Sequence, residues 1–89
     1  MANVIVTHGV GNMEVWLNGG ADRQKLFAPF CSSYSVYRQD GSNRVAIASR
    51  DVDLDKMQAA MTSPEIQAAM QAHTVLQPVE IFIEVPEQR

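Results

Sequence analysis

Residues 3–17 constrain the fold of this chain more than any other stretch, because a strand pattern leads directly into a helix start. The strand is expected over residues 3–10, where successive side chains alternate between two faces. One face would carry Val4, Val6, His8 and Val10. The other face would carry the β-branched residues Ile5 and Thr7, so this strand is expected in the middle of a sheet that is covered on both faces.

The helical region that follows is expected to be interrupted. Asn12 is a favourable N-cap for its first piece. Helical spacing would bring together Met13, Trp16 and Leu17. The pair Gly19-Gly20 then predicts a break, since two glycines in a helix interior cost about 2 kcal/mol relative to alanine. A second piece is expected over residues 21–28, ended by Pro29.

The middle of the chain predicts a β-hairpin. Residues 31–38 are rich in strand formers, and residues 39–43 form a strong turn signal that contains a glycine. Residues 44–49 are expected to be the returning strand. Its two faces would carry Val45 and Ile47 on one side, and Ala46 and Ala48 on the other.

The last third predicts a second interrupted helical region and a final strand. A helix is expected over residues 54–61, with an apolar stripe formed by Leu54, Met57 and Met61. Ser63 and Pro64 are typical of a new helix start. One face of this second piece would carry Ile66, Ala69, Met70 and His73. We interpret residues 74–78 as a connection and residues 79–85 as an alternating strand.

The predicted order of elements is β-α-β-β-α-β, which is the order of ferredoxin-like α+β domains with a four-stranded antiparallel sheet. Two helical regions can cover only one face of such a sheet. The uncovered face would carry the apolar side chains of Ile5, Ala46, Ala48 and Phe82. A second copy of the sheet, packed face to face in a two-fold dimer, is the simplest cover, so we expect a homodimer.

Size and charge exclude several classes of function. With 89 residues, the chain is expected to form a single domain over residues 1–89. Its net charge of −3 and its lack of a basic stripe argue against nucleic acid as a partner. No apolar run is long enough for a signal peptide or a transmembrane helix, so no membrane partner is expected. Cys31 is the only cysteine, and the expected compartment is the reducing cytoplasm.

Several short motifs fit one known architecture. They are His8-x-Val10 followed by Trp16-Leu17, Asp40-Gly41-Ser42-Asn43, Asp53-Leu54-Asp55, Ser63-Pro64-Glu65 and Gln77-Pro78-Val79-Glu80-Ile81. Over nearly the whole chain they resemble the dimeric α+β barrel superfamily. That superfamily includes antibiotic-biosynthesis-monooxygenase-like proteins, stress-responsive barrel proteins and haem-degrading oxygenases. The resemblance implies the fold and the dimer more than any particular reaction, because these motifs are structural rather than catalytic.

The chain departs from that superfamily at the residues that carry chemistry. The cofactor-independent oxygenases of the superfamily commonly use an asparagine, a tryptophan and an arginine around the pocket. Here the single tryptophan is Trp16 on the first helix, and His8 stands where an asparagine is expected. Haem-degrading members use an axial histidine, and His73 lies roughly at that place, but no tryptophan accompanies it. We therefore expect no cofactor, and a haem-binding or haem-degrading function is the least favoured.

A pocket between the sheet and the helices is the predicted functional site. Alternation and helical spacing direct His8, Trp16 and His73 toward one space. The other candidate lining residues are Met57, Met61 and Met70. The two histidines would move protons or bind a polar ligand group; alternatively, both are hydrogen-bonded histidines of the core. No metal is expected, because no third ligand has a recognisable spacing from them.

The remaining reactive side chains are interpreted as structural. Tyr34 and Tyr37 lie on opposite strand faces, so one would face the pocket and the other the partner subunit. Cys31 is expected to be a buried, inert thiol.

The leading hypothesis is a homodimeric barrel protein that binds a small apolar or aromatic molecule, with cofactor-independent monooxygenase-like activity as the first candidate. The alternative is a non-enzymatic structural or regulatory dimer whose pocket is filled core. The sequence does not decide whether the protein is an enzyme.

Overall fold

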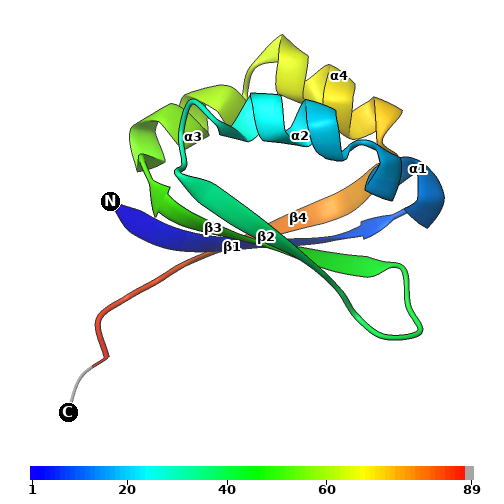
Figure 1. The fold of residues 1–89 in the computed structure, drawn as a ribbon, viewed down its shortest axis with the longest axis horizontal. Helices are drawn as coiled ribbons and strands as arrows, with labels where there is room; N and C mark the ends of the chain where they lie inside the picture. Colours follow the sequence, from blue (N-terminus) through cyan, green and yellow to red (C-terminus); the bar gives the residue numbers. More distant parts are fainter. Residues whose placement is uncertain (88–89) are drawn as a thin grey trace.

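A computed structural model describes residues 1–87. In chain order its elements are β1 (Ala2–Val10), α1 (Met13–Asn18), α2 (Gly20–Phe27), β2 (Ser33–Arg38), β3 (Arg44–Val52), α3 (Leu54–Met61), α4 (Pro64–Ala72) and β4 (Val75–Ile83). The strands form one antiparallel sheet in the order β2-β3-β1-β4, and the helices cover one of its faces (Figure 1). The predicted ferredoxin-like α+β fold is therefore confirmed.

β1 is an inner strand of the sheet, as its two apolar faces predicted, and pairs with β3 on one side and β4 on the other. The buried side chains on its helix-facing side are those of Val4, Val6, His8 and Val10. On the opposite side, Ile5 lies between Ala48 of β3 and Phe82 of β4. Ile5 is 45% exposed there and Phe82 is 55% exposed, so the apolar outer face is present and open in the single chain.

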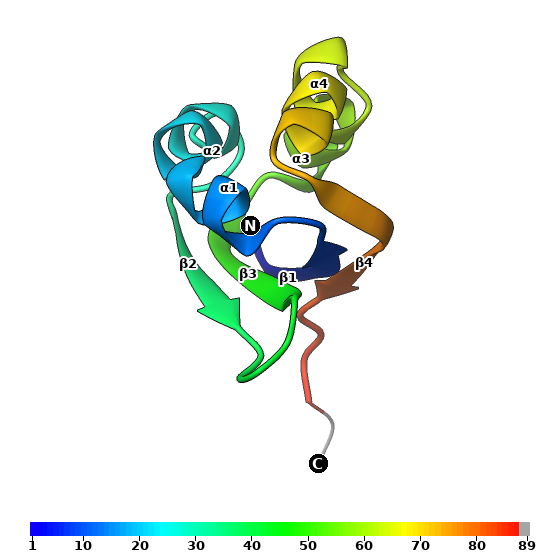
Figure 2. The same cartoon turned by 90° about the vertical axis from the view of Figure 1, so that its right-hand side faces the viewer.

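The helices form two arms that stand apart above the sheet (Figure 2). The first arm is α1 with α2, and the second arm is α3 with α4. α1 ends at Asn18 and α2 begins at Gly20, so the predicted break is confirmed. Ser63 caps α4 as predicted, since its side chain accepts a hydrogen bond from the backbone N–H of Ile66. No helix within residues 1–87 has the length and apolar character needed to cross a membrane.

The core consists of two clusters, one at each end of the sheet. The first cluster, here called the methionine end, contains Val4, Val6, Phe30, Val52 and Met57. The second, here called the tryptophan end, contains Val10, Trp16, Val45 and Ile47. Phe27 of α2 packs against both clusters and links them.

The last strand differs most from its prediction. Residues 74–78 were expected to be a connection, but β4 already begins at Val75 and ends at Ile83. The pairing of β4 with β1 shifts register between Thr7 and Gly9, so β4 holds two extra residues there. A proline within a strand is tolerated at an edge or a bulge, and β4 provides both for Pro78.

Smaller differences concern strand ends and two leucines. β2 begins at Ser33, two residues later than predicted, and β3 continues to Val52, which is buried and pairs with Ala2. Leu17 and Leu54 were placed on inward helix faces, but both are exposed, Leu17 by 51%. α1 has only six residues, and among them only Trp16 is buried, so its inward face is too narrow to include Leu17.

Candidate functional site

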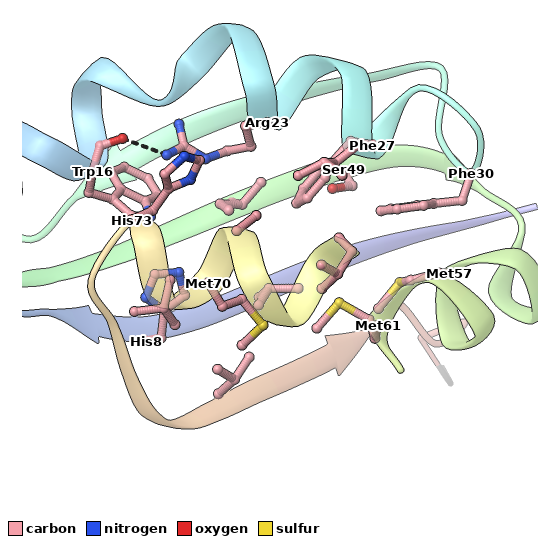
Figure 3. Close-up of a pocket in the computed structure, with 17 residues that line it drawn as sticks. His8, Trp16, Arg23, Phe27, Phe30, Ser49, Met57, Met61, Met70 and His73 are labelled. Atoms are coloured by element: carbon pink, nitrogen blue, oxygen red, sulfur yellow. Dashed lines mark hydrogen bonds between the residues drawn. The ribbon is translucent and has the colours of Figure 1, made fainter. Parts of the chain in front are cut away.

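An apolar cavity of about 70 Å³ lies between the sheet and the two helix arms (Figure 3). The candidate residues chosen from the sequence all border it: His8, Trp16, Met57, Met61, Met70 and His73. β1 contributes His8 from below, and the two arms contribute the others. The structure thus brings the six side chains together, and their functional role stays a prediction.

The volume of this cavity limits what it can hold. An engineered apolar cavity of about 150 Å³ binds benzene. The cavity here is about 70 Å³, which suits a few water molecules or a short branched apolar group. An aromatic ring would enter only if the two arms moved apart.

The polar groups around the cavity are concentrated at the tryptophan end (Figure 3). His8, Arg23 and His73 gather there around Trp16. At the methionine end the bordering side chains are apolar apart from Ser49. No aspartate or glutamate of the described chain borders the cavity.

His8 is a buried imidazole with a defined tautomer. It is 4% exposed, and its Nδ1 lies 2.8 Å from the carbonyl oxygen of Gly9. A carbonyl can only accept, so Nδ1 carries the hydrogen and Nε2 keeps a free lone pair. Burial lowers the pKa of His8 below 6.5, Arg23 and Arg44 lower it further, and the bond to Gly9 acts in the opposite direction. The ring is therefore neutral at pH 7 and can accept a proton from a ligand.

Arg23 is the functional candidate that the sequence analysis missed. It is 6% exposed, and its guanidinium carbon lies 3.9 Å from the centre of the Trp16 ring. Its Nη2 donates a hydrogen bond to the backbone oxygen of Trp16. Arg23 lies three and four residues before Leu26 and Phe27, and this spacing on one helix face was the available signal.

The charge of Arg23 is incompletely compensated in the described chain. Within residues 1–87 no carboxylate lies within ion-pair distance of it. Burial lowers the pKa of the guanidinium, but an arginine remains protonated at neutral pH. A cation–π contact contributes about 0.5–2 kcal/mol, whereas burying an ion costs several kcal/mol. The stacking on Trp16 therefore offsets only part of the cost.

At the tryptophan end, His73 follows the second arm and contacts the first. It follows α4 as its C-cap, and its Nε2 lies 3.6 Å from a carboxylate oxygen of Asp22 on α2. Its ring packs against Gly19: a Cβ added to Gly19 would lie 2.7–2.9 Å from three ring atoms. Gly19 has an ordinary φ of −81°, so this close approach is what requires glycine there.

The other reactive side chains have structural surroundings. Tyr34 faces the helices and packs on Phe27 with ring centroids 5.1 Å apart, while Tyr37 is exposed on the outer face opposite Ala46. Cys31 is half-buried rather than buried, and burial raises the pKa of its thiol. In the part of the chain described, no three histidine, cysteine, aspartate or glutamate side chains gather into a metal-binding group.

Known proteins resemble this chain in structure rather than in sequence. No protein-family model matches it, and neither does any curated protein. A candidate antibiotic biosynthesis monooxygenase from Bordetella bronchiseptica superposes with a TM-score of 0.73 at 17% identity, covering 98% of this chain and 97% of that chain. One from Caulobacter crescentus gives 0.70 at 16% identity, covering 98% and 90%. SnoaB, a cofactor-independent oxygenase from Streptomyces nogalater, gives 0.67 at 15% identity, covering 99% and 94%.

These neighbours are antibiotic-biosynthesis-monooxygenase-like proteins, which agrees with the resemblance found in the sequence. At such low identity they show that the fold is shared. The chemistry of this chain must therefore be argued from its own cavity.

Proposed function

We propose that this protein is a homodimer that binds a small apolar molecule in the cavity of each subunit and oxidises it with O₂ without a cofactor. The observation that carries the proposal is His8, a neutral imidazole with a free Nε2 in an otherwise apolar cavity. A base in such surroundings is suited to removing a proton from a bound molecule. The fold of SnoaB, which is a cofactor-independent oxygenase, adds support.

The proposed reaction uses groups that the cavity supplies. Nε2 of His8 takes a proton from an acidic C–H or O–H of the ligand, and Arg23 stabilises the anion that remains. The electron-rich anion then reduces O₂. In the balanced reaction a phenol and O₂ give a quinone and water: one oxygen atom becomes a new C=O group of the ring, and the other leaves in the water. The ligand supplies all four electrons, and the two hydrogens of the water come from its O–H group and from the ring carbon that is oxidised.

A second candidate function is binding without turnover in a structural or regulatory dimer. The volume of about 70 Å³ favours this alternative, because it leaves little room for an aromatic substrate. Under both candidate functions we expect a single domain that works in the cytoplasm. The cytoplasm is proposed because Cys31 has no second cysteine with which to form an intrachain disulfide.

Oxygen uptake tests the proposed reaction. Phenol, catechol and hydroquinone are first screened for binding by the rise in Tm, and the binders are then followed with an oxygen electrode. We expect uptake by the wild-type protein, loss of uptake in His8→Leu, and retention of uptake in Cys31→Ser, which changes a thiol outside the cavity. Compounds that bind but cause no uptake above the His8→Leu level would overturn the oxygenase proposal and favour the binding protein.

The dimer is proposed from the outer face of the sheet. Ile5, Tyr37 and Phe82 are exposed on it beside two alanines of β3. A patch of this kind on a small protein is typical of an interface. The same face on a second copy would cover it through a two-fold axis.

Sedimentation equilibrium at micromolar concentration tests the dimer. We expect a dimer for the wild-type protein and dissociation for Phe82→Asp, because the substitution places a carboxylate between the two sheets. Leu17→Asp is the matched control, since Leu17 is also exposed but lies on α1. A wild-type monomer would contradict the proposal.

A further inference from the structure

We propose that the ligand of this cavity is a small apolar monocarboxylate, held through its carboxylate by Arg23. The proposal rests on the proposed function only in taking the cavity to be a ligand site. It adds the charge and the chemical class of the ligand.

The first argument is the charge inside the cavity. Arg23 is 6% exposed, and no carboxylate of the described chain lies within ion-pair distance of it. The carboxylate of Asp22 at this end is exposed to solvent and lies against His73. His8 is neutral at pH 7. Arg23 is therefore a buried positive charge at the border of the cavity, with no carboxylate of the described chain paired with it, and an anionic ligand would balance it.

The second argument is the hydrogen-bonding capacity of the guanidinium. Arginine has five N–H donors in a fixed planar arrangement. Nη2 of Arg23 donates one hydrogen bond to the backbone oxygen of Trp16. No fully enclosed polar side-chain atom in the described chain lacks a partner, so the other nitrogens of Arg23 are not sealed within protein. Arg23 itself borders the cavity (Figure 3), so these nitrogens are available to a ligand there.

The third argument concerns rigidity and geometry. The stacking of Arg23 on Trp16 and its bond to Trp16 fix the plane of the guanidinium. A fixed planar guanidinium matches a carboxylate, which can accept two parallel hydrogen bonds from it. A carboxylate is also ionised before it enters the cavity, so it brings the missing charge without any proton transfer.

The fourth argument is the rest of the cavity. The rest of the border is formed by apolar side chains such as Leu26, Phe27, Met61 and Met70. The volume of about 70 Å³ fits a short branched hydrocarbon group. A molecule with a carboxylate at one end and a few carbons at the other could pair its carboxylate with Arg23 and place its carbons against the apolar side chains.

The test compares isobutyrate with its neutral isostere isobutyramide. Both are titrated at neutral pH into protein with ¹³C-labelled methionine methyl groups. Met57, Met61 and Met70 border the cavity, whereas Met1 is almost fully exposed and serves as the internal control. We expect isobutyrate to shift the three cavity methyls and to bind about 10- to 100-fold more tightly than the amide, as expected for hydrogen bonds to a charged group.

Variants test whether Arg23 causes the preference. Arg23→Met should abolish the preference for the anion, and Arg23→Lys, which keeps the charge but loses the planar donor pair, should reduce it. Arg38→Met is the matched control, because Arg38 is exposed on β2 and its substitution removes the same charge as Arg23→Met. The comparison of the two compounds in wild-type protein stands even if Arg23→Met does not fold.

Two results would overturn the inference in distinguishable ways. Equal affinity for the anion and the amide, or a preference that persists in Arg23→Met, would overturn the carboxylate and leave the ligand site standing. No shift of the cavity methyls with either compound would also overturn the inference. If the phenols of the oxygen test fail to bind as well, the proposed ligand-binding function falls with it.

Discussion

The tryptophan end and the methionine end of the cavity share a sheet and the side chain of Phe27, but they differ in their polar groups. The methionine end is built from valine, phenylalanine and methionine side chains, which need no hydrogen-bond partner. The tryptophan end buries an imidazole and a guanidinium around a single indole. Folding alone would favour apolar groups at both ends. We infer that the tryptophan end is shaped by a function and the methionine end by packing.

Removal of the indole should have the largest effect on stability. Trp16→Ala leaves a void in the core and removes the surface on which Arg23 stacks. We expect a loss of about 3–5 kcal/mol in the free energy of unfolding, a large part of the total for a chain this small. Urea unfolding monitored by circular dichroism measures it. A smaller loss than that of Met57→Ala at the other end would contradict the difference between the two ends.

The two glycines at the break provide a matched pair. Gly19→Ala forces a methyl group into the ring of His73 and should destabilise the protein by about 1–3 kcal/mol through overpacking. Gly20→Ala meets no atom within 4 Å and should be neutral, or stabilising by up to about 1 kcal/mol. Thermal melts of the two variants make the comparison. Equal effects would show that His73 does not pack on Gly19.

A conservative change at the methionine end should matter less. Met61→Leu nearly preserves volume at a half-buried position, so the loss should stay below about 1.5 kcal/mol. Urea unfolding gives the value, and the variant should retain the pH dependence of the wild-type protein. A loss as large as that of Trp16→Ala would show that the methionine end is as constrained as the tryptophan end.

The pH dependence of stability should report on His8. Burial holds its folded-state pKa below 6.5, so the unfolded chain binds more protons once the pH falls below 6.5. The contribution of His8 is thus retained above about pH 6.5 and declines as the pH falls toward the lowered pKa, by at most about 1.4 kcal/mol per pH unit. Urea unfolding between about pH 8 and pH 5.5 should show this decline in wild-type protein and not in His8→Leu. Parallel curves would contradict it.

The fold could be predicted because its signals are local. Alternation along residues 3–10, the glycine turn at residues 39–43 and the caps at Asn12 and Ser63 each determine nearby backbone. The start of β4 could not be predicted, because its pairing with β1 depends on an irregular register that a strand pattern does not encode. The break at Gly19 was predicted from helix propensity. The contact of Gly19 with His73 was not, because it joins segments more than fifty positions apart in the sequence.

The candidate site was only partly predictable for a related reason. Strand and helix periodicity directed His8, Trp16 and His73 to one side of the sheet. Arg23 was not predicted because a charged residue in a short helix is normally solvated, and its burial depends on contacts with the indole and the backbone oxygen of Trp16. Such compensation between two elements becomes visible only when both are placed in space.

The central claim is that His8 presents a free Nε2 to the cavity beside a fixed cation. The ¹⁵N resonances of its imidazole at neutral pH test this most directly, with the ring of His73 as a reference in the same spectrum. We predict a protonated Nδ1, hydrogen-bonded to the oxygen of Gly9, and an unprotonated Nε2 that shifts when isobutyrate binds. A hydrogen on Nε2, or an imidazolium at neutral pH, would contradict the account, because His8 could then accept no proton from a ligand.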